Sequence, residues 1–220
     1  MAETPELRPA SIRRLRRGEL PADTASLARF LIGKVVVREL PSGRVAGRIV
    51  ETEAYPQGDP AAHHFRGPTR RNRSMFLTRG HAYVYFSYGN HFMLNVSAEA
   101  AGVGGGVLIR ALEPLVGVEL MQQHRETTRL VDLARGPGRL TAALKIDRSL
   151  DGVDLCAAGP LWLGTLARPK VGSGDLETTR RAAFVVRKST RIGITRAAHR
   201  LLRFYERGNL FVSGPARLSK

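Results

Sequence analysis

The chain has 220 residues, a single cysteine and a formal net charge of +16. A domain of this length buries about 70% of the surface of its unfolded chain, so it needs neither a disulfide nor a metal to hold its fold. Because Cys156 is the single cysteine, the chain can form neither an internal disulfide nor a zinc site built from several cysteines. The excess of Lys and Arg attracts polyanions such as nucleic acids, although codon usage that favours arginine would also produce it.

The sequence shows no pattern of a secretion signal or a membrane span. Residues 1–17 lack the apolar stretch of a signal peptide, and the most apolar region, residues 102–120, contains Arg110 and Glu113. We therefore expect a protein of the cytoplasm or nucleoid in a bacterium, or of the nucleus in a eukaryote. No repeat or change in composition divides the chain. We predict one domain over 18–220, after a basic leader over 1–17 that is flexible or follows DNA.

The first half of the chain predicts a helix and two hairpins. The helix is capped by Asp23 or Thr24 and ended by Gly33, because apolar residues recur between them at helical spacing. A polar loop over 56–74, with a short helix around 71–76, separates the hairpins. Valine-rich and aromatic runs predict their strands over 34–40 and 45–55, and over 82–86 and 91–96.

The second half of the chain predicts shorter elements. A strand over 107–112 leads to Pro114, which opens a helix ending near His124, because proline is common in the first helical turn. The other predicted elements are a helix over 140–144, a strand over 161–163 and closing strands over 203–212. Strands follow one another with few helices between them. We therefore expect an α+β fold, a single compact domain with a curved, mostly antiparallel β-sheet flanked by helices.

Two glutamates stand in the second strand of the first hairpin. Alternation along a strand places Glu51, Glu53 and Tyr55 on one face. One explanation is an exposed acidic edge on a basic protein. The other is a carboxylate in a cleft that takes a proton from a water molecule as a general base. The pattern itself leaves both explanations open.

Three tyrosines fall within six residues of the second hairpin. Tyr83 and Tyr85 share one face of their strand, and core packing with the hydroxyl at the solvent explains Tyr83 well. Tyr88 falls at the turn. An exposed aromatic side chain in an arginine-rich protein suits stacking on bases or insertion between them.

Other residue types that carry chemistry have weaker patterns. His63 and His64 are neighbours on a loop, and no further ligand completes a metal site, so a surface or pocket role is favoured and no metal is predicted. Nothing near Cys156 in the sequence activates it as a nucleophile. The arginines in 70–73 and 135–139 either cradle phosphates or form a solvated face.

Seven longer motifs follow one another along the chain: GRIVETEAY (47–55), AAHHFRG (61–67), RRNRSMF (70–76), HAYVYFSYGNHFMLNVS (81–97), VLIRALEP (107–114), GPGRLTAALKID (136–147) and RIGITRA (191–197). In this order they resemble the alkyladenine (3-methyladenine) DNA glycosylase family of the mammalian type. The resemblance covers roughly residues 18–213.

The resemblance implies an enzyme of base excision repair. Such an enzyme flips a damaged purine nucleotide out of duplex DNA and hydrolyses its N-glycosidic bond. Glu53 matches the family's catalytic glutamate, the general base for water attacking C1′, and Arg110 matches the arginine that helps to hold this water. Glu51 is left with a structural role or with a role in supporting the residues that act directly. No lysine stands among the matched catalytic and base-pocket residues, where a Schiff base would need one, so the implied enzyme is monofunctional and uses no metal or cofactor.

The same resemblance assigns the base pocket. Tyr55, His63 and Tyr85 match the residues between which the flipped base stacks, and Asn95 matches the asparagine that rejects the 2-amino group of guanine. Tyr88 matches the residue that fills the gap in the duplex. A cationic alkylated purine gains more from aromatic faces than a neutral base does, because of cation–π attraction.

The implied partner is double-stranded DNA that contains damaged purines, bound by a monomer. The implied bases are 3-methyladenine and 7-methylguanine, with hypoxanthine and ethenoadenine as further candidates. Arginines in the matching motifs are expected at the DNA backbone, namely Arg70, Arg71, Arg73, Arg139 and Arg191.

Two other functions fit parts of the sequence. A non-enzymatic nucleic-acid-binding protein would use the charge and the tyrosines, but it gains nothing from a carboxylate such as Glu53 beside a base-stacking pocket. A nucleosidase would use the glutamate but would leave the net charge and Tyr88 without a role.

Overall fold

One curved β-sheet connects most of the chain in the computed structural model, which describes residues 11–87, 89, 91–167 and 184–215. The main path of the sheet has the strand order β1-β7-β2-β3-β6-β5-β4, β9 also pairs with β3, and β8 pairs with β9. Every strand pairing in the described residues is antiparallel. The strands are β1 (Ile12–Arg14), β2 (Val35–Leu40), β3 (Gly43–Tyr55), β4 (Ala82–Ser87), β5 (His91–Ser97), β6 (Gly106–Val116), β7 (Leu161–Leu166), β8 (Val186–Ser189) and β9 (Arg203–Glu206).

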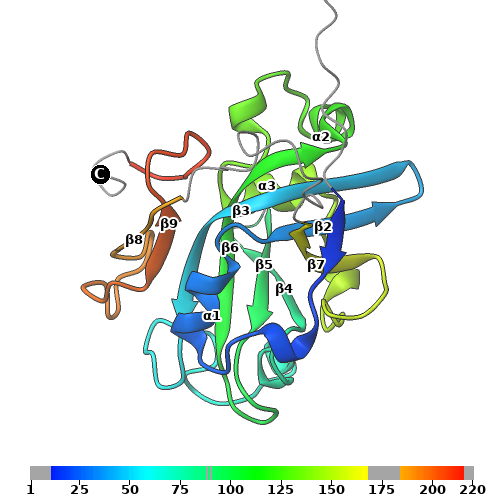
Figure 1. Ribbon diagram of the computed structural model, residues 1–220. Helices are drawn as coiled ribbons and strands as arrows, with labels where there is room; N and C mark the ends of the chain where they lie inside the picture. Colours follow the sequence, from blue (N-terminus) through cyan, green and yellow to red (C-terminus); the bar gives the residue numbers. More distant parts are fainter. Residues whose placement is uncertain (1–10, 88, 90, 168–183, 216–220) are drawn as a thin grey trace, which may run out of the picture.

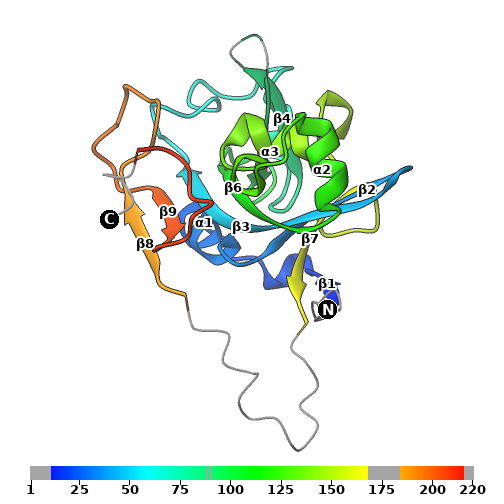
Figure 2. The same cartoon turned by 90° about the horizontal axis from the view of Figure 1, so that it is seen from above.

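Three α-helices accompany this sheet in the described residues: α1 (Thr24–Leu31), α2 (Val118–Arg125) and α3 (Pro137–Ala143). Short 3₁₀ turns lie at Arg17–Glu19, Arg73–Phe76, Leu130–Asp132 and Arg148–Leu150. The sheet bends around α2 and α3, as Figures 1 and 2 show from two directions. The predicted α+β fold with a curved antiparallel sheet and flanking helices is confirmed.

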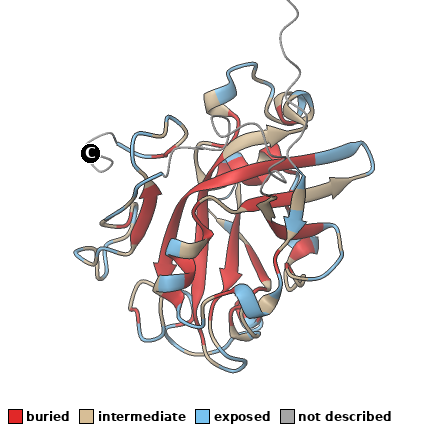
Figure 3. Cartoon of the chain, viewed as in Figure 1, coloured by how far each residue is buried: buried red, intermediate tan, exposed pale blue. Residues whose placement is uncertain are grey.

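The buried core lies along the middle of the sheet. The longest strands, β3 and β6, are buried over most of their length, whereas the tip of the β2–β3 hairpin is exposed (Figure 3). Ile49 of β3 and Ile109 of β6 pack with Leu27 of α1 and Leu140 of α3 in one cluster. The two central strands therefore form a rigid base for side chains on their other face.

The predictions for the first helix and both hairpins are confirmed. The Asp23 side chain accepts a hydrogen bond from the Ser26 amide at 2.9 Å and so caps α1 at its start. In the first hairpin Val36 lies opposite Gly47, and in the second hairpin Tyr83 lies opposite Asn95. Turn residues and periodicity predict these elements well, because the residues that pair within each of them are close in sequence.

The prediction that Pro114 opens a helix is wrong. Pro114 lies inside β6, opposite Gly47 and beside a shift in register, where the missing N–H of proline is tolerated. The helix begins at Val118, after Gly117 has turned the chain with a φ of 69°. Pairing with the long strand β3 extends β6 past the point where local preferences would end it.

Two boundaries also differ from the predicted ones. Ile12–Arg14, placed in the leader by the sequence, form β1 and pair with β7, so the sheet begins before residue 18; residues 1–10 lie outside the described part of the chain. Of the closing strands over 203–212, only Arg203–Glu206 form a strand. Its partner β8 was not predicted, because its exposed Arg187 and Lys188 resemble a loop in sequence.

None of the helices in the described residues has the length and apolar character that crossing a membrane requires.

Candidate active site

A cavity of about 230 Å³ opens beside the ends of the central strands. β3, β4, β5 and β6 all contribute side chains to it, and the segment 192–194 covers it from the C-terminal part of the chain. Six residues that the sequence assigned to catalysis or base binding line this one cavity: Glu53, Tyr55, His63, Tyr85, Asn95 and Arg110. They come from four strands and one loop, and only the folded sheet brings them together.

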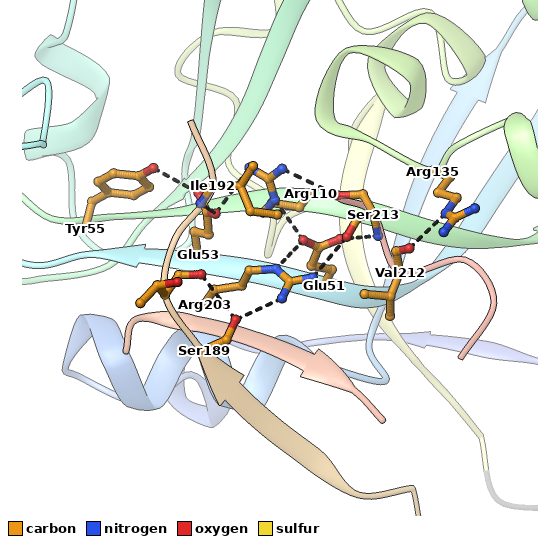
Figure 4. Close-up of polar contacts among 11 residues, drawn as sticks. Glu51, Glu53, Tyr55, Arg110, Arg135, Ser189, Ile192, Arg203, Val212 and Ser213 are labelled. Carbon is orange, nitrogen blue, oxygen red and sulfur yellow. Dashed lines mark hydrogen bonds and ion pairs between the residues drawn. The ribbon is translucent and has the colours of Figure 1, made fainter. Parts of the chain in front are cut away.

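Glu53 is fully buried at the cavity, with all its described polar contacts made inside the protein. Its Oε2 accepts a hydrogen bond from the Tyr55 hydroxyl at 2.9 Å, and its Oε1 accepts one from the Ile192 amide at 2.7 Å. Arg110 Nη1 lies 3.3 Å from the same Oε1 (Figure 4). The alternative of an exposed acidic edge is therefore wrong for this strand.

Glu51 lies on the same side of β3 and is also fully buried. It accepts hydrogen bonds from Arg110 Nε at 2.9 Å, from Arg203 Nε at 2.7 Å and from the Ser213 amide at 2.6 Å (Figure 4). Unlike Glu53, it does not line the cavity. Alternation along the strand correctly placed both glutamates on one face.

A shift in strand register aims Arg110 at the two glutamates. Ala111 lies opposite Glu51 and Ile109 lies opposite Thr52, so Arg110 has no partner residue on β3 at this point. An extra residue of this kind bends a strand and turns its side chain out of simple alternation. The bulge allows Arg110 and Ala111 to share a face, and the guanidinium reaches both carboxylates.

The protonation states of Tyr55 and Arg110 suit this arrangement. Burial and the neighbouring Glu53 carboxylate raise the pKa of Tyr55, so its phenol stays neutral and donates a hydrogen bond to the carboxylate. Burial disfavours charge on Arg110, but Glu53 and Glu51 more than offset this effect and raise the pKa of Arg110. The site therefore holds a cation and a neutral hydroxyl donor against Glu53.

Aromatic rings line another part of the cavity. The rings of Tyr83 and Tyr85 stack with centroids 5.2 Å apart, and the His63 ring meets Tyr85 edge-on at 4.4 Å. Tyr83 is buried as predicted, but its hydroxyl lies 3.1 Å from His63 Nδ1 instead of at the solvent. Burial and the charge of Arg71 lower the pKa of His63, so this ring is neutral at neutral pH.

Asn95 is buried at the cavity and lies opposite Tyr83 in the β4–β5 hairpin. Its Nδ2 donates to the Tyr83 carbonyl oxygen over 3.4 Å, which holds the amide in place. His64, the neighbour of His63, is directed elsewhere: its Nε2 lies 3.1 Å from the Pro56 carbonyl oxygen.

The arginines predicted to contact the DNA backbone divide into two groups. Arg70, Arg71 and Arg73 are exposed, and Arg71 lies over the ring of Tyr85 at the cavity. Arg139 is also exposed and pairs with Asp132 at 2.8 Å. Their contact with DNA stays a prediction. Arg191 is different, because its side chain is fully buried and pairs with Asp59 at 2.8 Å, so the prediction that it contacts DNA phosphate is wrong.

Sequence reasoning missed three groups that hold this site together. Asp59 pairs with Arg191, Arg203 pairs with Glu51, and the Ile192 amide binds Glu53. A buried arginine in a strand has the same local pattern as an exposed one, and a backbone amide has no sequence signal at all. Tyr88, predicted to enter the duplex, lies outside the described residues.

Comparison with known proteins gives a consistent result. Residues 19–210 match the family model described as methylpurine-DNA glycosylase. A protein of Mesorhizobium japonicum is 63% identical over 93% of this chain and 92% of its own length. A protein of Paraburkholderia phytofirmans is 52% identical over 93% of this chain and 90% of its own length, and one of Methanoculleus marisnigri is 47% identical over 87% and 94%. All three bear the name "Putative 3-methyladenine DNA glycosylase".

The family model spans most of the chain, and the identity to the relatives far exceeds the level at which a family is shared. The arrangement of Glu53, Arg110 and the aromatic cavity also suits hydrolysis beside a stacked base. The chain belongs to the methylpurine-DNA glycosylase family and is a DNA glycosylase of DNA repair.

Proposed function

We propose that this protein is a monofunctional glycosylase that removes alkylated and deaminated purines from duplex DNA. The proposed bases are 3-methyladenine and 7-methylguanine, with hypoxanthine and ethenoadenine as further substrates. The observation that carries the proposal is the buried Glu53 carboxylate beside an aromatic cavity, with Arg110 Nη1 at 3.3 Å. The cavity of about 230 Å³ lies below the roughly 300–1,000 Å³ of sites for drug-sized ligands, so it suits a single base.

In the proposed reaction, Glu53 takes a proton from a water molecule as the oxygen of that water bonds to C1′ of the flipped nucleotide. The bond between C1′ and the base breaks, and the base leaves with the electron pair. The Glu53 carboxylate also stabilises the positive charge that develops on the sugar, as carboxylates do in glycoside hydrolysis. Arg110 helps to hold the water beside Glu53.

The aromatic part of the cavity supports selection of damaged bases. A purine alkylated at a ring nitrogen is cationic, and Tyr55 and Tyr85 would attract it by cation–π interaction. His63 is neutral because its pKa is lowered, so it does not repel such a base. The side chain of Asn95 would clash with the 2-amino group of a normal guanine. That Tyr88 fills the gap left in the duplex remains a prediction from sequence.

The test is excision from duplex DNA treated with a methylating agent, in the presence of EDTA and followed by heating in alkali. We expect the wild type to leave abasic sites that become strand breaks, and Glu53→Gln to leave none above background. Glu113→Gln is the matched control, because Glu113 lies on β6 and binds Arg48 outside the cavity. It should cleave like the wild type.

Other results would reject the proposal. DNA binding by the wild type without breaks would indicate a non-enzymatic binding protein. Release of bases from free nucleosides but not from DNA would indicate a nucleosidase. Equal numbers of breaks with wild type and Glu53→Gln would remove Glu53 from the mechanism.

A further inference from the structure

The carboxylate of Glu51 has no direct role in the reaction proposed above, although it is fully buried within two residues of Glu53. It does not line the cavity, so it does not meet the base or the water. Burying a carboxylate is costly unless strong partners compensate it. The contacts of its three partners indicate what this buried charge does.

The first partner is Arg110, whose three guanidinium nitrogens have three separate acceptors. Nε donates to Glu51 at 2.9 Å, Nη2 donates to the Ser213 hydroxyl at 3.4 Å, and Nη1 lies 3.3 Å from Glu53. A guanidinium is planar, so fixing Nε fixes the direction of the other two nitrogens. The shortest of these three contacts is the one to Glu51, and it sets where Nη1 points (Figure 4).

The second partner is Arg203, which balances the charge of Glu51. Its Nε donates to the same Oε1 atom at 2.7 Å, and its other nitrogens donate to the Ser189 hydroxyl at 2.9 Å and the Ser213 carbonyl oxygen at 3.0 Å. Two carboxylates therefore face two guanidiniums. Because Arg203 neutralises Glu51, the charge of Arg110 remains available to Glu53.

The third partner is the Ser213 amide, which donates to Glu51 Oε2 at 2.6 Å. This bond fastens the end of the described chain to the centre of β3. It also fixes the second contact of Arg110, since the Ser213 hydroxyl is the acceptor for Nη2. One buried carboxylate thus binds Arg110 itself and also the residue that accepts from Arg110 Nη2.

We propose that Glu51 is a positioning residue for the reaction proposed above, which holds the Arg110 guanidinium so that Nη1 faces Glu53 and the attacking water. Glu51 acts on the reaction only through Arg110. Its loss therefore slows the chemical step, without weakening the binding of DNA. A displacement of about 1 Å in a catalytic group can cost on the order of 100-fold in rate.

The decisive experiment is a double-mutant cycle on the single-turnover rate of base release from methylated duplex DNA, with the variants Glu51→Gln and Arg110→Met. We expect Glu51→Gln to lower the rate by about 10-fold to 100-fold while the Kd for the same DNA stays within about twofold. In the absence of Arg110, the Glu51 change should have no further effect, so the double variant should match Arg110→Met. If the double variant instead loses the product of the two single-variant rate losses, the proposal is overturned.

Glu113→Gln is again the matched control, because it removes a carboxylate from Arg48 between the same two strands. It should lower the melting temperature without slowing base release, whereas a slower rate in this control would show that any lost ion pair disturbs the site. Should Glu51→Gln fail to fold, Arg203→Lys provides the same cycle, since it keeps the charge but loosens the hold on Glu51. Independent effects of Arg203→Lys and Arg110→Met would also overturn the proposal. A wild type without base release would instead reject the proposed function itself.

Discussion

The guanidinium of Arg191 lies over the ring of Tyr55, 4.6 Å from its centroid. Its Nη1 donates to the Ala54 carbonyl oxygen at 3.0 Å and pairs with Asp59 at 2.8 Å, and its Nη2 donates to Asp59 at 3.1 Å, so these acceptors hold the guanidinium in place. Tyr55 lines the cavity whereas Arg191 does not, which places the tyrosine ring between the cavity and the arginine. Arg191 thus packs inside the protein against a ring that lines the cavity.

The burial of Arg191 predicts that substitutions of Arg191 and Arg71 change the salt dependence of DNA binding differently. Arg191→Gln should leave the slope of log K for DNA binding against log salt unchanged, because no phosphate contact is lost. Arg71→Gln should reduce the slope by about 1, since Arg71 is exposed beside the cavity and each phosphate contact contributes about 0.9. Fluorescence anisotropy between low and physiological salt measures both slopes. A reduced slope for Arg191→Gln would contradict its assignment as an internal residue.

The buried amide of Asn95 predicts a change in the selection of bases. Replacing Asn95 by Ala leaves space at the cavity where the 2-amino group of guanine would fit, so release of normal guanine from undamaged DNA should rise by about 10-fold. Chromatography of the released bases measures this. Asn95→Leu keeps nearly the same bulk and should stay selective if exclusion is steric. Guanine release by Asn95→Leu equal to that of Asn95→Ala would show that the amide group, not its size, gives the selection.

The environment of His64 predicts a pH dependence of stability. Burial lowers the pKa of His64 below its ordinary value, and the residue is only 4% exposed. The unfolded chain therefore binds the proton more readily than the folded one, and the free energy of unfolding falls as the pH drops below about 6.5. One such group contributes a slope of at most about 1.4 kcal/mol per pH unit.

Urea unfolding between pH 7.5 and 5.5 measures this slope. His64→Gln should make it less steep, and His63, whose pKa is also lowered, should supply part of the slope that remains. A slope equally steep in His64→Gln and the wild type would assign the pH dependence to other groups.

The turn before α2 predicts a difference between two glycines. Gly117 and Gly58 both have a positive φ, of 69° and 73°, which costs about 1–2 kcal/mol for a residue with a Cβ. A Cβ at Gly117 would also clash with the Arg44 carbonyl oxygen, whereas a Cβ at Gly58 would meet nothing within 4 Å. Gly117→Ala should therefore lower the free energy of unfolding by at least about 1 kcal/mol more than Gly58→Ala. Urea unfolding compares the two variants, and equal losses would contradict the predicted clash.

The sequence by itself determined much of the local structure of this protein. The helix after Asp23 and both hairpins are specified by caps, turns and periodicity within short stretches of chain. Alternation also placed Glu51 and Glu53 on one face of β3. The motifs, in their order along the chain, identified the family.

Only the tertiary structure decided how those residues act together. The strand that continues through Pro114, the bulge that turns Arg110 toward β3 and the burial of Arg191 all depend on partners distant in sequence. A carboxylate that is exposed and one that is buried between arginines look the same along a chain. The difference is set by which strands pair, because pairing decides which charges share the low-dielectric interior.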